Sequence, residues 1–204
     1  MEKAAKYFFM TRAVEHQERA ADRLEDLKSE AISLKGEAAQ AADEDAANRC
    51  LCIEKMADAL RSQLLMWICL KQDRMDDAWD HLIDAQTQTR SSMQAHDMAS
   101  HLQAYSERLH AIEELVFPPQ VFLSVGGIIR GSRCSVCGEE YEECPHVKGR
   151  PYMGELCVRE ITDFEVREGS IVDTPANKHC RVIRLTDEEG VKRNWMTWRE
   201  VEEP

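Results

Sequence analysis

The first 117 residues contain no proline and one glycine, Gly36. Proline and glycine are the usual interruptions of helices, so their scarcity leaves this half free to form long helices. Apolar residues recur there every three or four positions, which predicts four amphipathic helices within 24–34, 50–67, 75–93 and 98–116, joined by short connections. Asp73 is placed to cap the third helix at its N-terminus. Pro118 and Pro119 end the last segment, because proline lacks an amide proton and restricts the residue before it. We predict an antiparallel helical bundle, or stacked helical hairpins, over residues 1–117.

The chain also lacks long apolar runs and an excess of basic residues. Its longest apolar run, residues 64–70, is far shorter than the roughly 20 residues of a membrane span. Residues 1–16 alternate charged and apolar side chains, unlike a secretory signal, so we expect a cytoplasmic protein. Lys and Arg number 26 against 38 Asp and Glu, a net charge of −12. We therefore expect neither a membrane nor a nucleic acid as a non-specific ligand.

The pattern changes after Pro119, where short runs rich in β-branched and aromatic residues alternate with Gly, Pro, Asp and Asn. Such runs predict strands, and TDEEG at 186–190 lies between two of them, HCRVIRL and VKRNWMTW, where it indicates a hairpin turn. Trp195 and Trp198 are three positions apart in the second run, which predicts one inward and one outward ring. The fold class is α+β, with a small β-rich domain at 118–204 after the helical domain.

A C-x-x-C-G motif lies in the β-rich half, formed by Cys134, Cys137 and a glycine, and followed by Cys144 and His146. In the reducing compartment that we expect, cysteines serve metal binding, catalysis or simple burial rather than a disulfide framework. Thiolates and imidazole in this spacing favour Zn²⁺, so we predict these three cysteines and the histidine as ligands. Cys157 is the alternative fourth ligand.

The predicted zinc is structural. Three thiolates and an imidazole fill a tetrahedral coordination sphere and leave no position for a hydrolytic water. The residues after Pro119 thus predict a zinc-finger-like β module that gains stability from its metal.

The helical half contains one pattern that indicates an enzyme. Arg90 and His96 match the R-x(4 to 6)-H pattern of HEPN ribonucleases, in which such a pair serves RNA cleavage. On a straight helix these two residues point about 120° apart, so they would converge only across a kink or a dimer interface. The simpler interpretation places His96 at the edge of a helical core.

The block CSVCGEEYEECPHVKGRPYMGELC at 134–157 resembles a cysteine and histidine block of poorly characterised bacterial and phage proteins. GSIVDTPAN at 169–177 is similar to the strand and Pro-Ala-Asn turn that closes the core of phage prohead proteases. The resemblance covers about 121–185. We locate neither the serine nor the histidine of the protease pair, so protease activity is not carried over.

These observations predict a non-enzymatic adaptor with a structural zinc module. The acidic helical domain would bind other proteins or self-associate, and the resemblance implies a bacterial or phage multi-protein system, such as anti-phage defence or phage assembly. The alternative is a HEPN-like ribonuclease or toxin that uses Arg90 and His96, with the zinc module for targeting.

Overall fold

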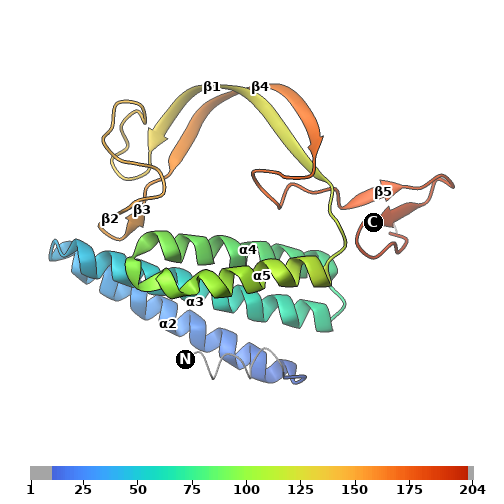
Figure 1. The fold of residues 1–204 in the computed structure, drawn as a ribbon, viewed down its shortest axis with the longest axis horizontal. Coiled ribbons are helices and arrows are strands. Elements are labelled where there is room, and N and C mark those ends of the chain that lie inside the picture. The colour runs from blue at the N-terminus through green and yellow to red at the C-terminus, as the bar shows by residue number, and fades with distance from the viewer. Residues whose placement is uncertain (1–10, 202–204) are drawn as a thin grey trace.

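The computed structural model describes residues 11–201 and shows helices followed by strands, which confirms the α+β class (Figure 1). Residues 1–10, which hold most of the segment used to exclude a secretory signal, lie outside the described part. The helical elements are α2 (Val14–Gln40), α3 (Glu44–Lys71), α4 (Met75–Ala95), the 3₁₀ helix η1 (Asp97–Leu102) and α5 (Gln103–Val116). Within the described residues, none of these helices combines the length and the apolar character of a membrane span.

Helix α3 lies at the centre of the helical layer, between α2 and α4. Its buried residues point in every direction around the helix, as expected for a helix covered on all sides. Helix α5 also reaches α3, where the Tyr105 hydroxyl donates a 2.8 Å hydrogen bond to Gln63 Oε1. The apolar stripe that the sequence predicts on α2 is shorter than expected, because Ala31 is buried but Leu34 is exposed.

Short turns connect the first three helices, as the sequence predicts. Asp43 caps α3, since its Oδ1 accepts a 3.0 Å hydrogen bond from the Ala46 amide. Asp73 does not cap α4 as its position suggests: it has a left-handed backbone with φ 60°, and Arg74 is the N-cap residue. The Asp73 carboxylate instead pairs with Arg199 near the C-terminus.

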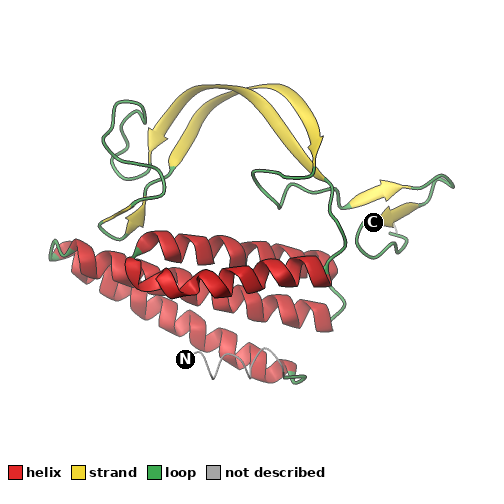
Figure 2. Cartoon of the chain, viewed as in Figure 1, coloured by secondary structure: helices red, strands yellow, loops and turns green. Residues whose placement is uncertain are grey.

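The strands form three separate two-stranded antiparallel sheets (Figure 2). They are β1 (Phe122–Cys134) with β4 (Arg159–Val172), β2 (Pro151–Tyr152) with β3 (Glu155–Leu156), and β5 (Arg184–Thr186) with β6 (Lys192–Asn194). The predicted TDEEG turn joins β5 to β6, with Gly190 at φ 83°.

The last strand is shorter than its sequence predicts. The Asn194 side chain accepts 2.9 Å hydrogen bonds from the amides of Met196 and Thr197, which turns the chain out of β6. Trp195 is half-buried and Trp198 is 56% exposed, so one ring is inward and one outward, but on a turn rather than on a strand.

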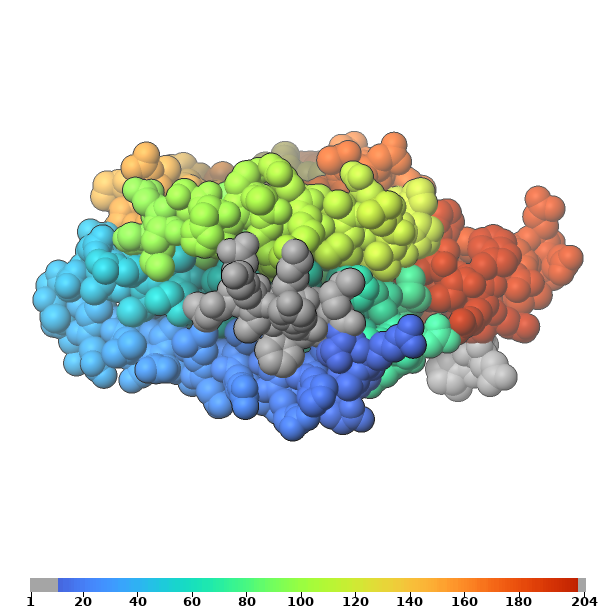
Figure 3. Space-filling model, turned by 60° about the horizontal axis from the view of Figure 1, so that its bottom comes forward, coloured from blue at the N-terminus to red at the C-terminus, as the bar shows by residue number. Residues whose placement is uncertain are grey.

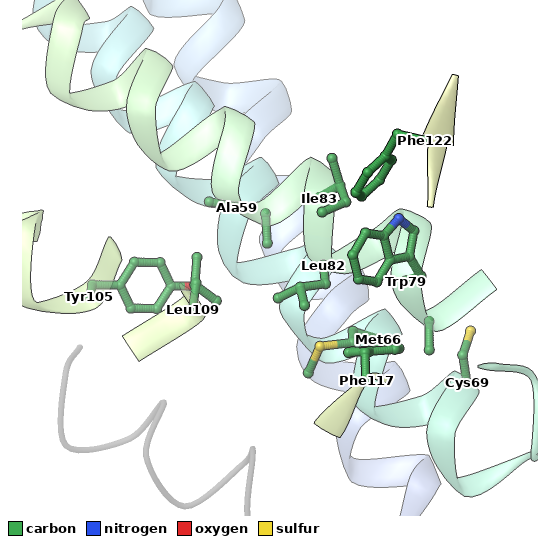
Figure 4. Close-up of a cluster of buried hydrophobic side chains, with 12 residues drawn as sticks. Ala59, Met66, Cys69, Trp79, Leu82, Ile83, Tyr105, Leu109, Phe117 and Phe122 are labelled. Carbon is green, nitrogen blue, oxygen red and sulfur yellow. The ribbon is translucent and has the colours of Figure 1, made fainter. Parts of the chain in front are cut away.

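The β1–β4 pair, which we call the ribbon, arches over the helical layer and is held at both ends (Figure 1). At one end Phe122 packs against Trp79 in the main core, where the Trp79 ring also meets Phe117 edge-on at 5.4 Å (Figure 4). At the other end Leu156 packs on a second apolar cluster, and the Gly154 amide donates a 2.8 Å hydrogen bond to Asn48 Oδ1.

The C-terminal segment attaches to α4 and α5 mainly through polar contacts, at one end of the molecule (Figure 3). Asp76, in the first turn of α4, accepts 2.6 Å bonds from the buried Arg181 guanidinium and from Asn194 Nδ2. Lys178 pairs with Glu113 of α5 at 2.7 Å. Acidic side chains on the helices thus provide the docking sites for the end of the chain.

We expect Trp79→Ala to lower the free energy of unfolding by about 3–5 kcal/mol, because it removes the ring that joins the helices to the ribbon. It also leaves the Lys178 carbonyl without the indole N–H that donates to it at 3.1 Å. Urea denaturation measures the change. Leu115→Ala, at a side chain 85% exposed, is the matched control and should change stability by less than about 0.5 kcal/mol. Equal effects would show that Trp79 does not join the two parts.

Candidate metal centre

The cysteine cluster lies in the connection between the two long strands of the ribbon. Cys134 is the last residue of β1, and the Gly138 amide donates a 2.8 Å hydrogen bond to its carbonyl. Gly138 has φ 76°, a conformation that glycine adopts without strain, which accounts for the glycine directly after the C-x-x-C motif. The Cys134 amide donates to the Glu139 carbonyl at 2.9 Å, which closes a tight loop around the two cysteines.

The four predicted ligands come together. The sulfur atoms of Cys134, Cys137 and Cys144 and a ring nitrogen of His146 all lie within 4.8 Å of one another. Cys134 is buried, Cys137 is exposed, and the other two are half-buried, so the cluster sits at the surface with one side closed. This arrangement is consistent with a metal site. It does not by itself determine which metal binds.

Cys157 is a fifth donor beside the cluster. Its sulfur lies 3.7 Å from that of Cys134, and its side chain is fully buried. Two thiolates on one tetrahedral zinc lie about 3.8 Å apart, given a Zn–S bond of about 2.3 Å. Backbone hydrogen bonds with Gly149 and Arg150 hold Cys157 in place. Cys157 thus lies beside the four grouped donors, and the choice between His146 and Cys157 as a ligand stays open.

His146 has a ring nitrogen that needs a partner. Its Nδ1 is buried and has no hydrogen-bond partner, while its ring meets the Tyr152 ring edge-on at 4.6 Å. The Tyr152 hydroxyl accepts a 2.9 Å hydrogen bond from the Val147 amide, which holds this ring beside the histidine. A buried unpaired nitrogen is costly, and a metal ion would satisfy it.

The electrostatics of the cluster also suit a cation. Burial raises the pKa of the Cys134 thiol, but the amides of Cys137 and Val136 and the neighbouring thiols donate to its sulfur, and its pKa falls to about 6. Burial and the nearby Cys134 thiolate raise the pKa of Cys157 to about 11, and burial also raises that of Cys144. Without a cation the site thus favours the thiolate of Cys134 and disfavours those of Cys144 and Cys157, whereas a divalent ion would stabilise all three thiolates.

Arg90 and His96 do not form a pair. Arg90 is exposed on α4, whereas His96 follows the last residue of that helix. His96 Nε2 lies 3.1 Å from Asp45 Oδ1, and its Nδ1 accepts a 3.0 Å hydrogen bond from the Met98 amide. Among the described residues, no hydrogen bond or ion pair joins Arg90 to His96. One imidazole nitrogen thus caps η1 and the other contacts the first turn of α3, which matches the interpretation of His96 as a residue at the edge of the helical core.

The residues that attach the cluster to the helices were not identified from the sequence. Gly154 has φ 83° and approaches both α2 and α3 closely, since a Cβ would lie 2.7 Å from Lys35 Cγ in α2 and 3.3 Å from the Ala47 carbonyl oxygen in α3. Its amide reaches Asn48, as described above. The only signal for this contact is a single glycine, which by itself indicates a turn and no particular partner.

Comparisons with known proteins give no family for this chain. No protein-family model, no curated protein and no solved structure matches it. The resemblance of residues 121–185 to bacterial and phage proteins therefore stays a hypothesis, and the evidence for function is the site itself.

We expect the purified chain to contain about one metal ion, and Cys134→Ser to lose it, because this change removes the most buried thiolate of the cluster. Elemental analysis after dialysis measures the content. Cys180→Ser is the control, since Cys180 is exposed and lies outside the cluster, and it should keep the metal. A metal-free wild-type chain, or equal loss in both variants, would contradict the site.

A second measurement identifies the fourth ligand. With Co²⁺ in place of the native ion, the intensity of the thiolate charge-transfer bands reports the number of bound cysteines. If Cys157 binds, Cys157→Ser should lower that intensity by about a quarter while His146→Ala leaves it unchanged, because a tetrahedral site has four ligands. If His146 binds instead, His146→Ala should change the ligand-field bands and Cys157→Ser should not.

Proposed function

We propose that this protein is a non-enzymatic adaptor in which a structural zinc ion holds the ribbon in place over the helical domain. The ligands are Cys134, Cys137 and Cys144, with either His146 or Cys157 as the fourth. Zinc is the metal of choice for a mixed set of thiolates and imidazole, and its bonds to four side chains would cross-link a loop that has little apolar core of its own.

The observation that carries the proposal is the convergence of four donors within 4.8 Å of one another. Four protein ligands fill a tetrahedral sphere, whereas catalytic zinc sites keep one position for water or substrate. Cys157, whose sulfur lies 3.7 Å from that of Cys134, is the alternative to His146 as the fourth ligand. A sphere filled by protein side chains is suited to holding structure rather than to chemistry at an open position.

The position of the site supports the same role. The cluster joins the end of β1 to the start of β4, and the chain between them also carries the contacts of Leu156 and Gly154 with the helices. An ion at this point would hold the end of the ribbon against the helical layer. The adaptor would then present two surfaces in a fixed relation, an acidic helical face and the ribbon.

The resemblance of residues 121–185 is the support for extending the proposal to a bacterial or phage multi-protein system. The ribonuclease alternative has no supporting contact in the site, since both ring nitrogens of His96 are engaged in structural hydrogen bonds.

Affinity purification of the tagged full-length chain from its native host tests the adaptor. We expect defined partner proteins to co-purify with the wild type and with Cys180→Ser, and to be reduced severalfold with Cys134→Ser, because that variant loses the fixed ribbon. RNA degradation by the purified wild type that disappears in His96→Ala would overturn the proposal in favour of the ribonuclease.

A further inference from the structure

The ribbon has one face made only of apolar residues and glycine over most of its length. Residues two apart on a strand share a face, as do residues directly opposite one another on paired strands. Leu123 lies opposite Ile171, and Val125 lies opposite Gly169. The register then shifts by one residue between Gly126 and Gly127, so that Gly127 lies opposite Val166 and Ile129 opposite Phe164 on the same face. The apolar side chains of this surface, which we call the apolar face, are Leu123, Val125, Ile129, Phe164, Val166 and Ile171.

The apolar face is open to solvent in the isolated chain. Its six side chains are between 36% and 72% exposed. Phe122 and Val172 belong to the opposite face of the ribbon, and both pack into the main helical core. At that end of the ribbon the apolar face must therefore point away from the helices. A contiguous exposed apolar surface of this kind marks an interaction site.

The local sequence is specialised to keep this face continuous. A Cβ on Gly127 would lie 2.3 Å from the Glu165 carbonyl oxygen and 2.7 Å from Cζ of Phe164, so the Phe164 ring covers the glycine. The ring thereby fills the gap that a residue without a side chain leaves on the face. Only glycine permits this close approach.

The ribbon also lacks the second layer that a sheet requires. Two-stranded sheets are marginal by themselves, and stable sheets pack one face on another element. The contacts described above hold the ribbon to the helices at its two ends, which leaves the apolar face between them without a packing partner among the described residues.

Charge indicates which partner fits. The chain has a net charge of −12, yet β1 and β4 together carry four arginines and four acidic residues. Some of these already pair within the ribbon, as Arg167 does with Glu165 at 2.7 Å. A highly charged partner would find no complementary field here. A second copy of the same neutral, apolar face would meet no like-charge repulsion at the contact.

We infer that the apolar face binds the same face of a second copy of this chain around a two-fold axis. Six half-exposed apolar side chains offer on the order of 500 Å² per copy, or about 1,000 Å² in total, which is near the lower limit for a specific interface. An isologous contact brings identical patches together, so each apolar side chain counts twice. The inference rests on the proposed function, because the metal centre holds one end of the ribbon.

Sedimentation velocity of the metal-loaded full-length chain under reducing conditions tests the inference. Over roughly 1–100 μM, the range suited to a small interface, we expect a monomer–dimer equilibrium. Val125→Lys should weaken the dimer by at least about tenfold, because it buries a charge from each copy. Ser170→Lys is the matched control, with the same new charge on the opposite face and one residue from Gly169, the partner of Val125.

The outcomes separate this inference from the metal site. The metal content of each variant tests the metal centre, whereas the sedimenting mass of each variant tests the contact through the apolar face. A monomeric wild type overturns the inference and would mean that the apolar face binds a different protein. Equal weakening of the dimer by Val125→Lys and Ser170→Lys also overturns it. Val166→Lys disrupts the same face at a second position and serves if Val125→Lys does not fold. A dimer that persists in Val166→Lys contradicts the inference.

Discussion

A two-stranded ribbon cannot hold itself in place, and the rest of the structure reflects this constraint. The ribbon is about 40 Å long if extended, somewhat longer than the 30 Å or so of α4 beneath it, and it bends to meet the helices at both ends. One end is fixed by aromatic packing of Phe122 on Trp79. The other is joined to the cysteine cluster and to Asn48. Two different interactions, one apolar and one suited to metal, therefore serve the same purpose.

The helices were predictable from the sequence because their signals are local. The apolar period, the scarcity of proline and glycine, and the stop at Pro118 are all read within a few residues. A helix covers each predicted segment, although α2 and α3 extend beyond the predicted bounds and the fourth segment divides into η1 and α5. The errors arose from distant partners. Asp73 is a capping residue by type, but its carboxylate pairs with Arg199. Leu34 follows the apolar period, yet it is 47% exposed among the described residues.

The residue types of the cluster were predictable from the sequence, but their full arrangement in space was not. The spacing of Cys134 and Cys137, with Gly138 behind them, requires a tight loop, and the structure has that loop. Whether His146 or Cys157 supplies the fourth bond depends on how a remote turn approaches the cluster, which sequence spacing does not encode. The sequence indicated the pairing of β5 with β6 through the TDEEG turn, but not that of β1 with β4 or of β2 with β3, since those runs predict strands without indicating their partners.

The polar docking of the C-terminal segment has a consequence for the order in which the chain folds. Arg181 is buried against Asp76, which lies 105 residues earlier, and Lys178 meets Glu113 across 65 residues. The helical layer is built from neighbouring segments and can form while synthesis continues, but these pairs close only when the last residues have been made. Until then Asp76 in α4 and Glu113 in α5 are carboxylates whose cationic partners have not yet been made.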